Sequence, residues 1–144
     1  MEFKIMEDQT ANNKLDTLQK LHLDTQKWKS SFFLIDDEIL FIEQLLHSYV
    51  FEPNTPNLFE RLQDYLERLK HIKGDKTNMQ KLLVQHENNL GGSIESENGK
   101  WDEDVHMEHE KLKANVANCL QQFQTLKSEI FNYAGGILKR RRPD

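Results

Sequence analysis

The sequence predicts an all-α fold, an antiparallel up-down-up bundle of three long helices with the heptad pattern of a coiled coil. Large apolar residues recur at alternating steps of four and three along three stretches of this 144-residue chain. Because an α-helix has 3.6 residues per turn, this spacing places them on one stripe of each helix. Prolines, which break helices, stand only at positions 53, 56 and 143. No stretch sustains the apolar-polar alternation of a strand.

The first helix is expected at about 14–51. Its clearest part is WKSSFFLIDDEILFIEQLLHSY, whose apolar stripe comprises Trp28, Phe32, Ile35, Ile39, Ile42, Leu46 and Tyr49. The stripe continues backwards through Thr25, Leu21 and Leu18. Residues 1–13 precede this pattern and are interpreted as an N-terminal arm or docking segment.

The second helix is expected at about 56–90. The segment EPNTP at 52–56 ends one helix and starts another, since Thr55 suits the N-cap and Pro56 the first helical position. The stripe is Leu58, Leu62, Tyr65, Leu69, Ile72, Lys76, Met79, Leu83, His86 and Leu90. Its register passes Gly74 without a shift, and an interior glycine costs only about 1 kcal/mol relative to alanine. One continuous helix is therefore preferred to two.

The third helix is expected at about 102–137, after a flexible loop, GGSIESENGK, at 91–100. Three acidic residues at 102–104 suit the positive end of a helix dipole. The stripe is Val105, His109, Leu112, Val116, Cys119, Phe123, Leu126, Ile130, Tyr133 and Ile137. Gly135 and Gly136 are expected to fray the last turn. The chain thus divides into the arm, one bundle domain at 14–138 and a basic tail at 139–144.

The short turn after the first helix fixes which residues share a layer of the bundle. Counting from this turn places Ile35 beside Ile72 and Phe123 in a dry core. The same count places His86 beside His109 near the opposite end, which is therefore expected to be polar.

The first helix carries more large apolar residues than a three-helix core can cover. Phe33, Leu34, Phe41 and Leu45 flank its stripe, and contiguous exposed apolar surface usually marks an interface. We expect these residues to contact a second copy of the chain in a homodimer, since closed symmetric pairs are the commonest oligomers. Alternatively, the N-terminal segment folds back as a fourth helix, or wide helix faces wrap a tighter core.

Composition argues against several classes of function. The net charge of −5 disfavours nucleic-acid binding, because phosphate-binding proteins concentrate Lys and Arg on one face. The basic run at 139–142 is read as favourable charge at a helix C-terminus, with an acidic partner, RNA or membrane contact as the alternative. A single cysteine, Cys119, cannot form an internal disulfide, and no apolar run is long enough for a transmembrane segment. These features favour a cytoplasmic protein.

No catalytic motif or cofactor-binding motif is present, and Cys119 lies in an apolar stripe as an inert core thiol. Four histidines, His86, His106, His109 and His22, gather towards one end of the predicted bundle. Neutral imidazole binds transition metals, so a metal site is the alternative hypothesis. A di-iron carboxylate bundle is disfavoured because it needs two E-x-x-H helices and the sequence contains only one such pair, Glu103 with His106. The sequence favours a non-enzymatic scaffold or adaptor that acts by protein-protein contact.

Overall fold

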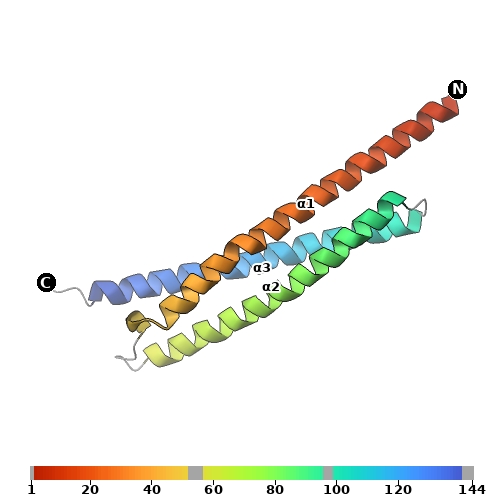
Figure 1. Cartoon of the computed structure of the whole chain (residues 1–144). Coiled ribbons are helices and arrows are strands. Elements are labelled where there is room, and N and C mark those ends of the chain that lie inside the picture. The colour runs from red at the N-terminus through yellow and green to blue at the C-terminus, as the bar shows by residue number, and fades with distance from the viewer. Residues whose placement is uncertain (1, 52–56, 96–98, 141–144) are drawn as a thin grey trace.

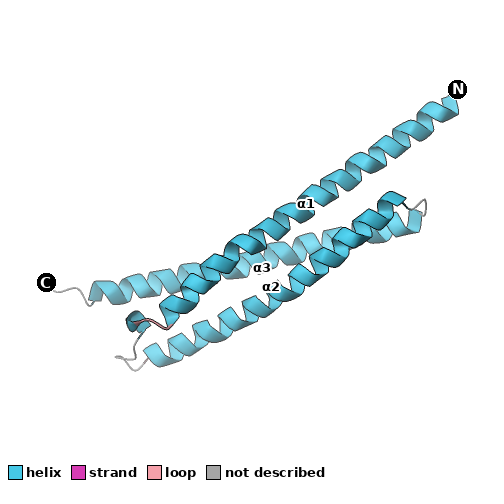
Figure 2. Ribbon diagram, in the orientation of Figure 1, coloured by secondary structure: helices cyan, strands magenta, loops and turns pink. Residues whose placement is uncertain are grey.

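The computed structural model describes residues 2–51, 57–95 and 99–140, and this part of the chain forms three long helices (Figure 1). They are α1 (Glu2–Leu46), α2 (Leu58–Glu95) and α3 (Gly99–Arg140), with a short 3-10 turn, η1 (Tyr49–Phe51), after α1. Helices α1 and α3 run in one direction and α2 runs in the other. All regular elements in the described ranges are helical (Figure 2). The predicted all-α bundle is confirmed.

Helix α1 begins at Glu2, twelve residues before its expected start at 14. No glycine or proline lies between Glu2 and Leu46 to interrupt the helix. The first turns of α1 continue straight beyond the ends of α2 and α3 in Figure 1. A fourth helix folded back from the N-terminal segment is therefore wrong.

The C-terminal end of α1 is also displaced, from the expected residue 51 to Leu46. The Ser48 hydroxyl donates a hydrogen bond to the Leu45 carbonyl at 2.6 Å, and the Val50 amide donates to Ser48 Oγ at 3.3 Å. Serine competes with the helical backbone for hydrogen bonds in this way and so favours turns. The chain then enters η1, where Val50 and Phe51 are buried.

The predicted loop at 91–100 is wrong for most of its length, since α2 continues to Glu95 and α3 begins at Gly99. Leu90 and Ser93 are both buried and extend the α2 stripe by a step of three. No glycine among the described residues has a positive φ, so these glycines adopt ordinary helical backbone. The expected fraying at Gly135 and Gly136 is wrong for the same reason, because α3 extends to Arg140. The expectations for 52–56 and 141–144 fall outside the described residues.

The single helix predicted across Gly74 is confirmed within α2. The main core lies along the middle and the α1–α2 turn end of the bundle, where Phe32 and Phe123 are fully buried. A second, smaller apolar cluster of Leu18, Leu21, Leu90 and Val105 lies towards the other end. The polar end that the sequence predicts is therefore an internal polar layer, followed by this further apolar cluster.

Ion pairs join the helices outside the core. Lys73 Nζ lies 2.5 Å from Glu43 Oε1, and Lys127 Nζ lies 2.7 Å from Glu38 Oε2. Solvent-accessible pairs of this kind contribute roughly 0–1 kcal/mol each. Lys76 differs because only 9% of the residue is exposed, with its ammonium group paired to Asp36.

Candidate functional site

The internal polar layer contains a row of four ionisable groups, here called the histidine network: Asp24, His109, His86 and Glu108. Each of the three helices contributes to it, since Asp24 comes from α1, His86 from α2 and the other two from α3. The rings of His86 and His109 are buried, with His86 Nε2 lying 2.8 Å from His109 Nδ1. The predicted neighbourhood of these two histidines is confirmed.

A carboxylate lies at each end of the network. Asp24 Oδ2 lies 3.1 Å from His109 Nε2, and Glu108 Oε1 lies 2.5 Å from His86 Nδ1. Because ionised carboxylates only accept hydrogen bonds, each outer ring nitrogen must carry a proton to donate. The two inner ring nitrogens, His86 Nε2 and His109 Nδ1, face each other in the middle of this row.

The histidine network is enclosed by further contacts. The Trp28 ring lies 4.7 Å from the His109 ring, centroid to centroid, and the Asn89 side-chain amide donates to Glu108 Oε1 at 3.1 Å. Burial lowers the pKa of His109, and the neighbouring His86 lowers it further, while the hydrogen bond that His109 donates to Asp24 opposes both effects. Protonation of His109 is therefore disfavoured relative to that of a free imidazole.

The structure does not bring the four predicted metal ligands together. His22 and His106 are exposed, while the ring nitrogens of His86 and His109 face each other and the two carboxylates. Within residues 2–51, 57–95 and 99–140, no group of three or more His, Cys, Asp or Glu side chains is arranged to hold a metal ion. Burial raises the pKa of the Cys119 thiol, as expected of an inert core cysteine. The arrangement gives the metal hypothesis no support.

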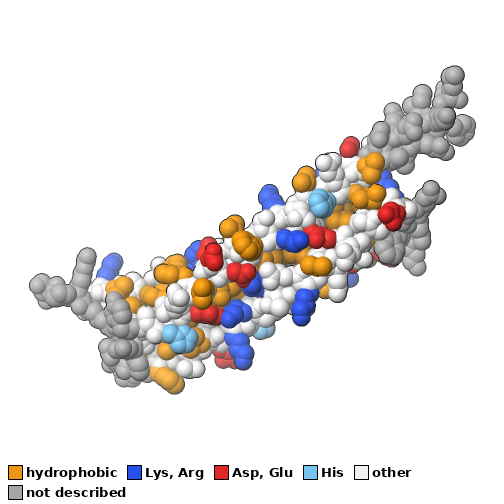
Figure 3. Space-filling model, in the orientation of Figure 1, with side chains coloured by type: hydrophobic (Ala, Val, Ile, Leu, Met, Phe, Trp, Pro, Cys, Tyr) orange, Lys and Arg blue, Asp and Glu red, His pale blue; other side chains and the backbone are white. Residues whose placement is uncertain are grey.

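Three of the four predicted interface residues lie on the side of α1 that faces away from the core. Phe33, Leu34 and Phe41 are 72%, 66% and 55% exposed, respectively. Leu45 differs from them because it is half-buried against the main core. The face shown in Figure 3 carries apolar side chains along its length, with charged ones between them.

The outer side of α1 has exposed apolar residues besides the predicted interface residues. Leu23 and Leu40 are also exposed, and Val84 of α2 joins Phe33 and Leu34 around a groove of about 590 Å³. Helical spacing could have identified Leu23, because it lies eleven residues, about three turns, before Leu34. Val84 could be assigned to the groove only once α2 was placed beside α1.

Comparisons with known proteins do not identify a relative: no family model, curated protein or solved structure matches this chain. None of the helices in the described ranges has an apolar stretch long enough to cross a membrane.

Proposed function

We propose that this protein is a non-enzymatic scaffold or adaptor that acts through protein-protein contact, and that it forms a homodimer through the outer face of α1. The observation that carries this proposal is the run of exposed Phe33, Leu34 and Phe41 on one helix. Burying a Leu or Phe side chain contributes roughly 1.5–3 kcal/mol. A partner that covers these residues therefore gains substantial free energy.

A second copy of the chain is the simplest partner for this surface. In a two-fold pair the same surface is used by both subunits, so every apolar residue of the interface is buried twice. Helix α1 presents this surface on a scaffold held by the main core, because Phe32, Ile35 and Ile39 on its opposite side are buried. The proposal includes a cytoplasmic location, which the single buried cysteine supports.

Sedimentation equilibrium tests the proposal. We expect a dimer at tens of micromolar protein and a monomer for Leu34→Asp and Phe41→Asp, since each buries two charges in the interface. Phe59→Asp is the matched control, because Phe59 is 56% exposed but lies on α2. This control should remain dimeric. A monomeric wild-type protein, or equal loss of the dimer in all three variants, overturns the assigned interface.

A further inference from the structure

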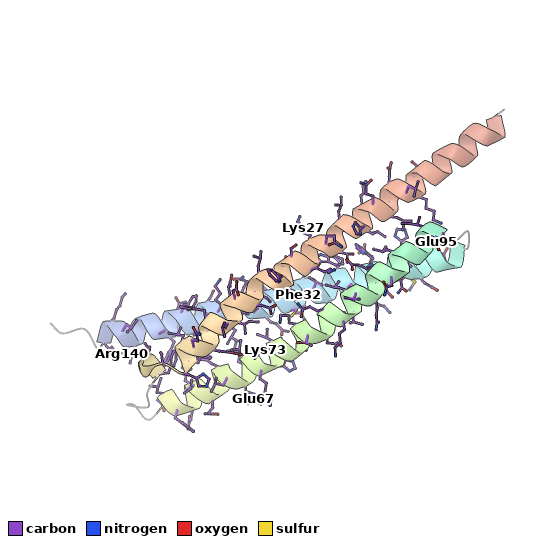
Figure 4. The ribbon with its side chains drawn as sticks, viewed as in Figure 1. Lys27, Phe32, Glu67, Lys73, Glu95 and Arg140 are labelled. Atoms are coloured by element: carbon purple, nitrogen blue, oxygen red, sulfur yellow. The ribbon has the colours of Figure 1, made fainter. Side chains whose placement is uncertain are left out.

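Six exposed residues form a second heptad row on the outer face of α1, here called the outer row: Leu23, Lys27, Ser30, Leu34, Asp37 and Phe41. Their steps are four, three, four, three and four. At 100° per residue this spacing keeps all six on one side of the helix, nearly opposite the core stripe. Figure 4 labels Lys27 on the outer side of α1 and Phe32 between α1 and the other helices.

The outer row of one copy is complementary to the outer row of a second copy that runs in the opposite direction. Turning a second α1 antiparallel, with the two-fold axis level with residue 32, places position 23 opposite position 41 of the other copy. Leu23 then meets the aromatic ring of Phe41, while Lys27 meets the carboxylate of Asp37. Ser30 meets Leu34, and two-fold symmetry makes each of these contacts twice.

We propose that two copies of this chain pair antiparallel, α1 against α1, through the outer row with Lys27 of each copy opposite Asp37 of the other. This inference rests on the proposed homodimer and adds its orientation and register. The carrying observation is the matched placement of apolar and oppositely charged residues about one point. Lys27 and Asp37 are both exposed, and no ion pair within the described ranges uses either of them.

The other pairings of the outer row are less favourable. A parallel pair sets Lys27 against Lys27 and Asp37 against Asp37, and facing like charges repel. An antiparallel pair shifted by one heptad sets Leu23 against Leu34 and Lys20 against Asp37. It also sets Phe41 against the carboxylate of Asp16 and leaves Lys27 opposite Ser30. A shift in the other direction sets Leu34 against Asp37. The register about residue 32 pairs Lys27 with Asp37 and sets no carboxylate against Phe41.

Charge-reversal variants of the full-length chain test the register, with the dimer dissociation constant measured by sedimentation equilibrium. Lys27→Glu and Asp37→Lys should each weaken dimerisation about tenfold, because each turns two attractive contacts into repulsive ones. Combining the two substitutions restores opposite charges in every contact. The double variant should therefore dimerise within about twofold of wild type, with the differences shrinking at high salt.

Lys20→Glu is the matched control, because Lys20 is also exposed on α1 but lies opposite Gln44 in the proposed register. It changes the net charge as Lys27→Glu does, yet it should neither weaken the dimer as strongly nor rescue Asp37→Lys. Wild-type protein that stays monomeric contradicts the proposed function itself. If neither single charge reversal weakens dimerisation, or if the double variant does not restore it, only the register is contradicted. Circular dichroism establishes that each variant is folded.

Discussion

Mild acid should destabilise the bundle through the histidine network. Burial holds the pKa of His109 below its unfolded value of about 6.5, with His86 of α2 adding to the effect and Asp24 of α1 and Glu110 opposing it. A base whose folded pKa is lowered binds its proton more readily in the unfolded chain. Its stabilising contribution is therefore complete above about pH 6.5 and is lost as the pH falls below that value.

The size of this loss has an upper limit. If His109 stays neutral in the folded protein while the unfolded chain takes up its proton, acidification from pH 7.5 to 5.5 costs about 1.4 kcal/mol. For a chain of this size that corresponds to a fall in Tm of about 3–5 °C. Burial of the ring and the neighbouring His86 both oppose protonation of His109 in the folded protein.

Urea unfolding followed by circular dichroism measures this prediction at the two pH values. In His109→Gln the pH dependence should shrink, whatever the variant's stability at pH 7.5. The matched control is His106→Gln on the exposed side of α3, which should keep the wild-type dependence. Wild-type stability that is unchanged or higher at pH 5.5, or full pH dependence in His109→Gln, would refute the reasoning.

Two further predictions concern single residues of the bundle. Asp36→Asn should lower the free energy of unfolding by about 1–2 kcal/mol, since it leaves the nearly buried Lys76 without its partner. Glu67→Gln on the exposed side of α2 should change it by less than about 0.5 kcal/mol, and urea titration compares the two variants. Gly74→Ala should raise the unfolding free energy by about 0.5–1 kcal/mol, because an added Cβ meets nothing within 4 Å and alanine favours helix; an unchanged or lower Tm contradicts this.

Helix identity and the core could be read from the sequence because both depend on a local period. The buried residues Phe32, Ile72 and Phe123 all lie on stripes spaced by three and four. Helix ends were harder to predict, since they depend on small competing terms. Gly91 and Gly92 resemble a loop by composition, yet α2 passes through them because a glycine costs the helix only about 1 kcal/mol.

The two candidate sites were predictable to different degrees. The meeting of His86 with His109 followed from counting residues along antiparallel helices. The two carboxylates could not be predicted by this count, because neither Asp24 nor Glu108 lies on a core stripe. Similarly, sequence spacing identified exposed Phe33 and Leu34, whereas the partial burial of Leu45 depends on how the helices pack.

The sequence alone determined three helices, their buried stripes and the excess of apolar residues on α1. With 3.6 residues per turn, the spacing of residues determines the side of the helix on which each side chain lies. Only the tertiary structure decided that α1 starts at Glu2 and that Leu45 belongs partly to the core. It also decided that His86 and His109 contact each other and two carboxylates rather than His22 and His106. These features depend on the rotation and axial position of each helix against its neighbours, which side-chain packing sets and no local pattern encodes.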